Sequence, residues 1–242
     1  MAPDAAAPLI FIVSIVAGGI ATITGFGIGS LLTPAFALWA DTRLAVAAVS
    51  IPHLLGTAIR FWLVKGHVDR GVLWSFGLAS AAGGLTGALL HSRATSPALE
   101  LVFGMLLLFV AASELSGLSK RLKFTGVWAW LAGSLSGLLG GLVGNQGGIR
   151  AGALLGFSMP KQAFVATATA IGLMVDAARM PVYAVVMGPQ IADLWWLIAV
   201  ACAGVTAGTL GGARVLRRIP EAVFRPVVAV LIGLLGLSML LR

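Results

Sequence analysis

Charged side chains interrupt the long apolar stretches of this sequence at Arg60, Arg150, Asp176 and Arg179. Inserting a charge at the centre of a membrane helix costs about 2.5–3.5 kcal/mol, so such a residue is retained where it pairs or faces a cavity. Asp176 and Arg179 are three residues apart, so they share a helix face and can form a structural ion pair. Arg60 lies near Lys65 and can alternatively extend to the membrane surface. The three arginines are candidates to balance the charge of a bound anion.

Two glycine-rich segments interrupt the longest apolar stretches, one around Gly27 and one around Gly147. Lipid cannot satisfy the backbone groups that such a break leaves open, so a break persists only where it faces protein or water. The helix after each break directs N–H groups and a partial positive charge at it, which favours an anion. Helix packing is the other common use of such glycines, and we expect it for Gly83 and Gly87. Candidate substrate contacts in the two breaks are Thr24, Gly25, Phe26, Gly27, Asn145, Gln146, Gly147 and Gly148.

A few further polar residues lie within apolar stretches. His53 follows Pro52, and a histidine at such a depth can be a hydrogen-bonded packing residue, a substrate contact or a proton carrier. Asp176 and His53 are therefore the candidates for proton coupling. Ser50 and Thr169 can offer hydroxyl groups to a substrate or bond back to their own helices.

The composition indicates an integral membrane protein. Apolar residues make up 59% of the 242 residues and charged residues only 10%, whereas a soluble domain typically has about 25% charged residues. The net charge of +8 fits the enrichment of Lys and Arg in cytoplasmic loops, and no polar element gathers these residues for nucleic-acid binding. We find no catalytic, phosphate-binding or metal-binding motif, so the sequence favours neither an enzyme nor a metal or cofactor site.

Hydropathy divides the chain into apolar blocks that can form membrane helices. A helix needs about 20 apolar residues to cross the bilayer, and most blocks have about that length. The first and fifth blocks are longer and contain the glycine-rich breaks. The blocks cover residues 9–39, 44–64, 71–91, 98–118, 126–157, 161–186, 190–213 and 221–241.

An offset of 119 positions aligns the two halves of the chain. It places Gly18 on Gly137 and Arg60 on Arg179, and it aligns the two glycine-rich breaks. The order of blocks is also the same in both halves. We therefore expect a duplication with residues 1–119 as the first half and 120–242 as the second, together forming one membrane domain.

The distribution of Lys and Arg favours an inverted repeat. If each long block crosses the membrane once, the loop cations divide equally between the two sides. If each long block folds back at its glycines, the division obeys the positive-inside rule and both termini lie outside the cytoplasm. The cytoplasmic side then has Lys65, Arg70, Lys120, Arg121, Lys123, Lys161, Arg214, Arg217 and Arg218, and the other side has Arg43, Arg93 and Arg242.

The glycine-rich openings of the two halves, residues 18–29 and 137–148, carry a family resemblance. With the duplicated block order, the Gly-Phe-Gly element at 25–27 and the Gly147-Gly148 pair, the chain resembles the TauE/SafE sulfite exporter family over nearly its whole length. The resemblance implies a secondary permease for sulfur-containing anions such as sulfite, sulfoacetate, other organosulfonates or thiosulfate. Asn145 and Gln146 depart from the small or apolar residues expected there, so the substrate stays open.

These observations predict an all-α transporter in the cell membrane, with one central anion site between two inverted halves. The expected partners are the lipid bilayer and a small anionic substrate, and nucleic acid is not expected. Two other functions remain open: an uncoupled anion channel with the same site, and a membrane scaffold that transports nothing. The oligomeric state is also open, and a homodimer is compatible with the sequence.

Overall fold

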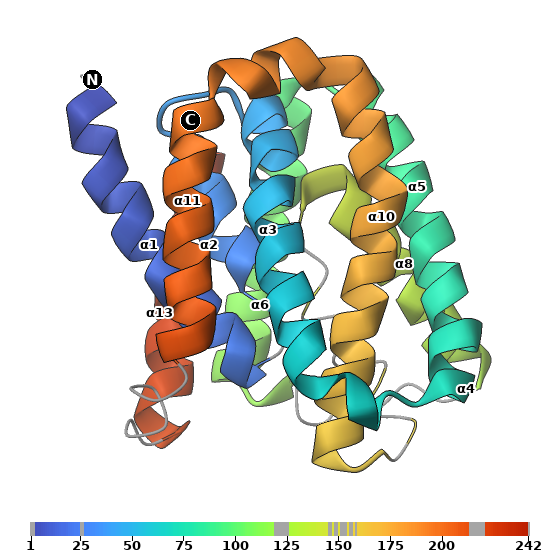
Figure 1. The fold of residues 1–242 in the computed structure, drawn as a ribbon. Helices are drawn as coiled ribbons and strands as arrows, with labels where there is room; N and C mark the ends of the chain where they lie inside the picture. The colour runs from blue at the N-terminus through green and yellow to red at the C-terminus, as the bar shows by residue number, and fades with distance from the viewer. Residues whose placement is uncertain are drawn as a thin grey trace.

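The computed structural model describes residues 3–24, 27–118, 126–144, 159–212 and 221–241, together with residues 147, 150, 154 and 157. The regular elements of these residues are helices, as the sequence predicted (Figure 1). They are α1 (Pro3–Thr24), α2 (Ile28–Phe36), α3 (Thr42–Val64), α4 (Arg70–Val72), α5 (Leu78–Arg93), α6 (Ser96–Leu115), α8 (Val127–Val143), α10 (Lys161–Asp193), α11 (Trp195–Ala207) and α13 (Glu221–Leu240).

Short turns connect or extend some of these helices. A 3-10 turn, Lys65–His67, follows α3, and the π-helical turn Leu73–Gly77 joins α4 to α5. A second π-helical turn, Gly208–Gly212, extends α11. Asp41 and Asp69 cap the N-termini of α3 and α4, because their carboxylates accept hydrogen bonds from the N–H groups of the first helical turn.

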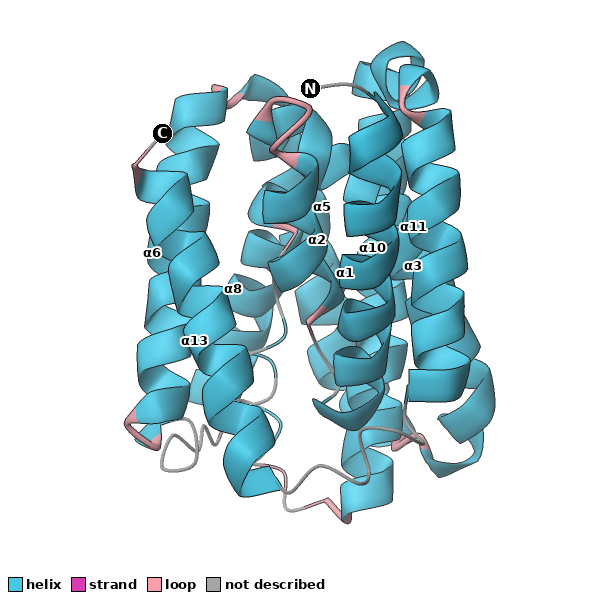
Figure 2. Cartoon of the chain, turned by 90° about the vertical axis from the view of Figure 1, so that its left-hand side faces the viewer, coloured by secondary structure: helices cyan, strands magenta, loops and turns pink. Residues whose placement is uncertain are grey.

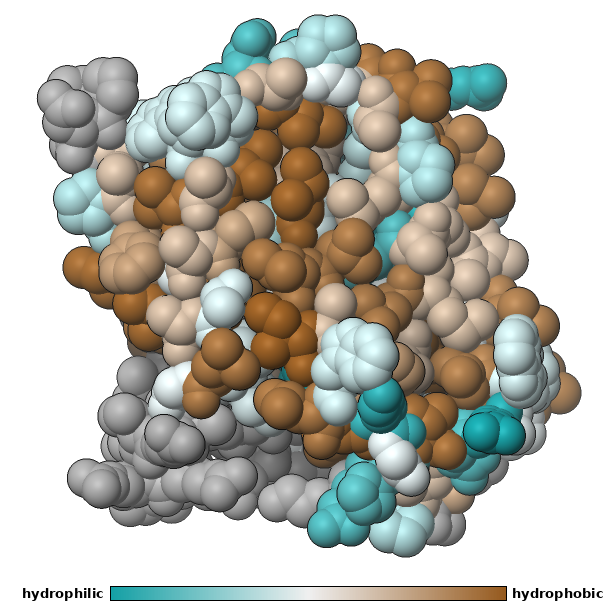
Figure 3. Space-filling model, in the orientation of Figure 1, coloured by the Kyte–Doolittle hydropathy of each residue, from teal (hydrophilic) through white to brown (hydrophobic). Residues whose placement is uncertain are grey.

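The outer surface is apolar in the way that a lipid-facing surface requires. Val185, Trp62 and Trp128 are 85%, 67% and 70% exposed. Figure 3 shows a broad hydrophobic band across the middle of one face, with hydrophilic residues mainly near its two ends. The helical segments long and apolar enough to cross a membrane are Thr42–His67, Arg70–Arg93, Ser96–Ser113 and Gln162–Asp193. The chain is therefore a multi-pass membrane protein.

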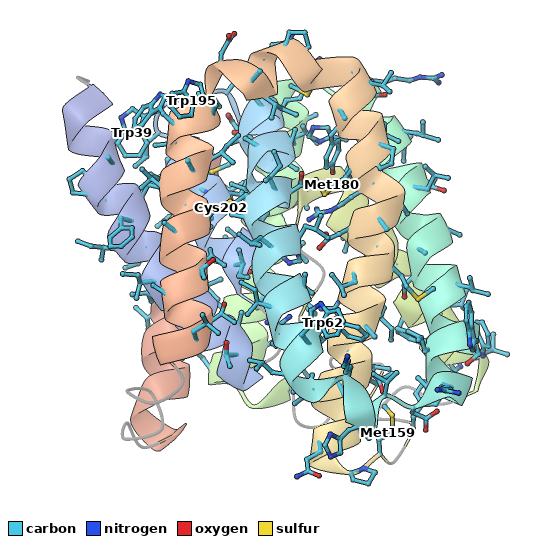
Figure 4. The ribbon with its side chains drawn as sticks, in the orientation of Figure 1. Trp39, Trp62, Met159, Met180, Trp195 and Cys202 are labelled. Atoms are coloured by element: carbon cyan, nitrogen blue, oxygen red, sulfur yellow. The ribbon has the colours of Figure 1, made fainter. Side chains whose placement is uncertain are left out.

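Tryptophans also mark the end of the molecule that carries the termini. Trp39 and Trp195 lie together at this end (Figure 4). The indole ring combines an apolar body with one N–H donor, which suits the boundary between lipid and water. Both chain termini lie at this same end (Figures 1 and 2).

Helices that occupy equivalent places in the two halves of the sequence run in opposite directions. α3 runs away from the end with the termini and α10 runs towards it (Figure 1). α6 and α13 lie side by side (Figure 2), and they run in opposite directions, because Gly104 lies against Leu240 whereas Ala111 lies against Gly233. α5 runs towards the termini, whereas α11 runs away from them (Figure 1).

Close contacts between glycines and backbone hold two further helix pairs together. A Cβ on Gly83 or Gly87 of α5 would collide with carbonyl oxygens of α8, so the packing role expected for both glycines is confirmed. α1 and α11 meet in the same way, because a Cβ on Gly18 would stand 2.6 Å from the Val205 carbonyl oxygen. In these two interfaces, the helix that opens the first apolar block of one sequence half (α1 or α8) packs on the helix of the third block of the other half (α11 or α5).

The glycine-rich breaks occur where the sequence predicted them. Gly27, with φ of 130°, precedes α2, and Gly144 ends α8 in the left-handed region, with φ of 75°. Side chains with a Cβ rarely adopt these backbone angles, so glycine is needed at both positions. One boundary differed from expectation, since residues 190–193 continue α10 instead of opening the next helix. Hydropathy locates the apolar part of a helix, whereas its hydrogen bonds continue into the polar interface.

Candidate functional site

Helices α3 and α10 pack against each other in opposite directions and bring buried polar residues together (Figure 1). Both helices are mostly apolar and cross the molecule, so these polar residues lie away from the two ends. Successive polar positions on α3 therefore meet positions on α10 in reverse order. The facing pairs are His53 with Asp176, Thr57 with Gly172, and Arg60 with Thr169.

Asp176 is the centre of one group of contacts. The Asp176 Oδ2 atom lies 2.7 Å from His53 Nδ1. The Asp176 Oδ1 atom accepts from Arg179 Nε at 2.9 Å and lies 2.8 Å from Arg179 Nη2. The ion pair between Asp176 and Arg179 that the sequence suggested is thus present, and both side chains are buried. An ionised carboxylate only accepts hydrogen bonds, so the His53 proton then lies on Nδ1.

Each guanidinium nitrogen of Arg179 contacts a protein oxygen. Its Nη1 atom donates to the Gly140 carbonyl oxygen at 2.5 Å, in addition to the contacts with Asp176. Tyr183, one helical turn further along α10, donates to the carbonyl oxygen of Gly141. The Arg179 guanidinium also lies 5.9 Å from the Tyr183 ring centroid. Arg179 and Tyr183 therefore tie α10 to the end of α8.

Arg60 points into the protein and does not extend to the membrane surface. It is 3% exposed, its Nε donates to Thr169 Oγ1 at 3.0 Å and its Nη1 donates to the Ala21 carbonyl oxygen at 2.7 Å. Lys65 interacts elsewhere, with its Nζ 3.6 Å from the centroid of the Trp62 ring. The partners of Arg60 are neutral, so these hydrogen bonds leave its charge without a bonded counterion.

Arg150 lies in the same region and is 3% exposed. Its Nη1 atom has no hydrogen-bond partner among the described residues. A Cβ on Gly172 would stand 3.2 Å from this atom, so the guanidinium lies against α10. Arg60 and Arg179 are close enough to repel the Arg150 charge, and Asp176 is close enough to attract it.

The described edges of the two glycine-rich breaks meet beside this cluster. A Cβ on Gly29, in the first turn of α2, would collide with the Gly144 carbonyl oxygen. A Cβ on Gly144 would in turn stand 3.7 Å from Arg179 Nη1 and 3.6 Å from Thr33 Oγ1. The breaks are therefore parts of one region together with the arginines, as an anion site would require.

The structure does not place the other predicted substrate contacts as clearly in this region. Ser50 is buried, but its hydroxyl donates to the Ala47 carbonyl oxygen of its own helix. Thr169 does the same to Val165 while accepting from Arg60. Gly147 is helical and buried. Gly25, Phe26, Asn145, Gln146 and Gly148 lie outside the described residues, as does the side chain of Thr24.

Sequence reasoning missed three residues of this region: Thr57, Gly172 and Tyr183. Thr57 is one turn from His53 on α3, and the offset of 119 places it on Asp176. The same offset places His53 on Gly172, so the alignment of the halves contained a signal for both. Tyr183 is the only tyrosine of the chain and lies four residues after Arg179, which was a helical-spacing signal.

Comparison with known proteins identifies the family. No curated protein and no solved structure matches the chain. A family model described as sulfite exporter TauE/SafE matches residues 10–239. The match runs from within α1 to within α13 and includes the buried arginine cluster. The chain therefore belongs to the TauE/SafE sulfite exporter family.

Proposed function

We propose that this chain is a secondary transporter that moves small sulfur-containing anions, such as sulfite, thiosulfate or an organosulfonate, through a central site. The family supports the class of protein and of substrate. One observation carries the proposal: Arg60, Arg150 and Arg179 are all buried in one region in which Asp176 is the single buried carboxylate among the described residues. Buried charges without counterions cost several kcal/mol each, and a bound anion removes that cost.

The site lies between two halves that we propose to be an inverted repeat of residues 1–119 and 120–242. The opposite directions of α3 and α10, and of α6 and α13, support this arrangement (Figures 1 and 2). Two hydrogen bonds support it further. Arg60 donates to Ala21 and Arg179 donates to Gly140, each across 39 residues of the chain, and the two bonds are related by the offset of 119. Rocking of one half against the other would open the site alternately to each side.

We propose that the end with the termini faces away from the cytoplasm of the cell membrane. Lys65 and Arg70 follow the end of α3 and precede α5, at the opposite end of the molecule. Cytoplasmic loops are enriched in Lys and Arg, which supports this orientation. Arg43 and Arg93 lie at the end with the termini, and the Arg43 Nη2 is bound at 2.6 Å to the Ser92 carbonyl oxygen.

The pair of His53 and Asp176 offers a route for coupling transport to protons. Asp176 already shares its charge with Arg179 through Oδ1, and its other oxygen contacts His53. Arg60 and Arg150 are the other charged groups of the same region. A proton taken up by His53 adds a positive charge near the anion, so proton and anion would bind together.

Transport in proteoliposomes tests the proposal. We expect purified protein to move radiolabelled sulfite or thiosulfate across the membrane, with saturation and with acceleration by a proton gradient. Arg150→Gln should reduce the initial rate at least about tenfold, which corresponds to about 1.4 kcal/mol. Arg93→Gln removes an equal charge at an exposed position and should transport like the wild type.

The outcomes separate the three functions. Flux that does not saturate and ignores an imposed proton gradient would identify an uncoupled channel. Protein that is folded and inserted but moves no anion would favour a scaffold. Equal rates for Arg150→Gln and Arg93→Gln would show that the buried cations are structural.

A further inference from the structure

The α3–α10 crossing contains two facing pairs that the offset of 119 relates to each other. This offset places His53 on Gly172 and Thr57 on Asp176, so the pair His53–Asp176 corresponds to the pair Thr57–Gly172. The first pair is joined by a contact of 2.7 Å and bound to Arg179. In the second pair, the methyl group of Thr57 is the part of its side chain that lies nearest to the glycine. The two sides of the crossing are therefore equivalent in position and different in chemistry.

The side at Thr57 has hydrogen-bonding groups without partners. Thr57 is 0% exposed and Arg150 is 3% exposed. Neither Thr57 Oγ1 nor Arg150 Nη1 has a hydrogen-bond partner within the part of the chain that the structure describes. An unsatisfied buried polar group destabilises the folded protein, and a charged one does so more strongly. Two such groups in one place indicate that a ligand completes them.

Gly172 is the position at which both side chains pack on α10. A Cβ at this position would stand 3.4 Å from Thr57 Cγ2 and 3.2 Å from Arg150 Nη1. An added methyl group would therefore press on the Arg150 guanidinium and displace it.

Charge shows how many negative charges the ligand must supply. Asp176 and Arg179 form an ion pair and neutralise each other. Arg60 has neutral hydrogen-bond partners, and Arg150 has one unpartnered nitrogen. The region therefore has two cationic groups without a bonded carboxylate among the described residues.

We infer that the anion binds on one side of the α3–α10 crossing, beside Thr57 and Arg150 where they pack at Gly172, and that the preferred anion carries two negative charges. This inference rests on the proposed function. The Thr57 hydroxyl and Arg150 Nη1 donate hydrogen bonds to the oxygens of the anion, and Arg60 balances the second charge. We call this anion site, formed by Thr57 and Arg150 at Gly172, the seat. The ion pair of Asp176 and Arg179 stays intact on the opposite side of the crossing.

Binding measured on purified full-length protein in detergent tests the seat. The probes are sulfate and thiosulfate as dianions, and nitrate and acetate as monoanions, all at neutral pH and constant ionic strength. Thr57→Val removes the hydroxyl with little change of shape, and Gly172→Ala adds one methyl group. The matched controls are Thr86→Val, whose exposed hydroxyl bonds to its own helix, and Gly188→Ala, whose Cβ would meet no atom within 4 Å.

We expect dianions to bind the wild type at least about tenfold more tightly than monoanions, a difference of about 1.4 kcal/mol. Thr57→Val and Gly172→Ala should each weaken dianion binding by at least about tenfold, and both controls should bind like the wild type. Without ligand, Thr57→Val should melt no lower than the wild type, because valine leaves no hydroxyl unsatisfied. A merely structural threonine would show the reverse: a lower melting temperature and unchanged affinity.

Other results would contradict specific parts of this inference. If the wild type binds dianions and both seat variants bind them equally well, the seat is wrong and the transporter proposal stands. If monoanions bind as tightly as dianions, the charge preference is wrong. If the folded wild type binds no anion and moves none in proteoliposomes, the proposed function fails together with the seat. If Gly172→Ala fails to fold, Thr57→Val alone decides.

Discussion

Arg60 and Arg179 occupy equivalent places in the two halves of the sequence but have different surroundings. Each donates from Nη1 to a backbone carbonyl 39 residues earlier, at the end of the first helix of its half. Arg179 also has a carboxylate, Asp176, whereas the Nε of Arg60 donates to the neutral hydroxyl of Thr169. Both arginines therefore make the same kind of backbone contact, but only Arg179 has a carboxylate as its counterion.

In the proposed repeat, this difference would leave one anion site between two related halves. Hydrogen bonds from a guanidinium to carbonyl groups hold the first helix of each half in place without depending on a ligand. A carboxylate beside one arginine makes that arginine structural, because the charges compensate each other. The arginine without a carboxylate keeps its charge available. The comparison therefore predicts that equivalent mutations in the two halves have unequal effects.

The largest effect should come from removing the carboxylate. Asp176→Asn leaves Arg179 buried without a counterion, and breaking a buried ion pair in this way costs about 3–5 kcal/mol of folding stability. We expect a clearly lower melting temperature in detergent. Asp193→Asn is the control, because this residue ends the same helix and is exposed. Equal melting of the two variants would show that Asp176 does not stabilise Arg179.

The packing glycines should behave alike in both halves. Gly18→Ala places a Cβ against the Val205 carbonyl oxygen, and Gly137→Ala places one against that of Ser80. The helices must move apart in both interfaces, and we expect each variant to lose about 1–3 kcal/mol of folding stability. Thermal unfolding beside Gly188→Ala checks this expectation. A large loss for only one of the two would show that the interfaces are not equivalent.

A carboxylate introduced at position 57 should compensate the charges of Arg60 and Arg150, as Asp176 compensates the charge of Arg179. The offset of 119 places Thr57 on Asp176, so Thr57→Asp supplies the charge that the first half lacks. We expect the ligand-free protein to be at least as stable as the wild type and anion affinity to fall at least about tenfold, or about 1.4 kcal/mol. Titration with sulfate, with Thr57→Asn as the neutral control, measures this. Undiminished binding would contradict the seat.

The smallest change in stability should come from His53. His53→Asn keeps an amide donor near the position of Nδ1 but cannot take up a proton, so the expected loss is only about 1 kcal/mol. We expect anion transport to persist and its dependence on pH to flatten. Initial rates in proteoliposomes over a range of pH test this. An unchanged pH profile would assign proton coupling to another group.

Much of the site was visible in the sequence. Arg60, Arg150, Asp176 and Arg179 stood out because charges are costly inside apolar stretches, and the structure brings all four into one region. The pairing of Asp176 with Arg179 followed from their spacing of three residues. Ser50 was a weaker candidate, because a serine in a helix readily bonds to its own backbone, as this one does.

Thr57 and Gly172 could not be chosen from the sequence by type. Threonine and glycine are common in membrane helices, and neither is costly there. Their role depends on facing each other across two helices, and on Arg150 reaching the same place. That arrangement depends on how the helices pack, which the pattern of apolar residues leaves open.

The sequence by itself determined that the chain forms apolar membrane helices, that two of them break at glycines, and that charges lie inside. These are local properties, fixed by hydropathy and by backbone conformation within a few residues. Only the tertiary structure decided which charges compensate each other. The contacts between His53 and Asp176 and between Arg60 and Thr169 join residues 123 and 109 positions apart. Such contacts exist only because α3 packs on α10 in one register. Within the described residues, that packing leaves Arg60 and Arg150 without a bonded carboxylate.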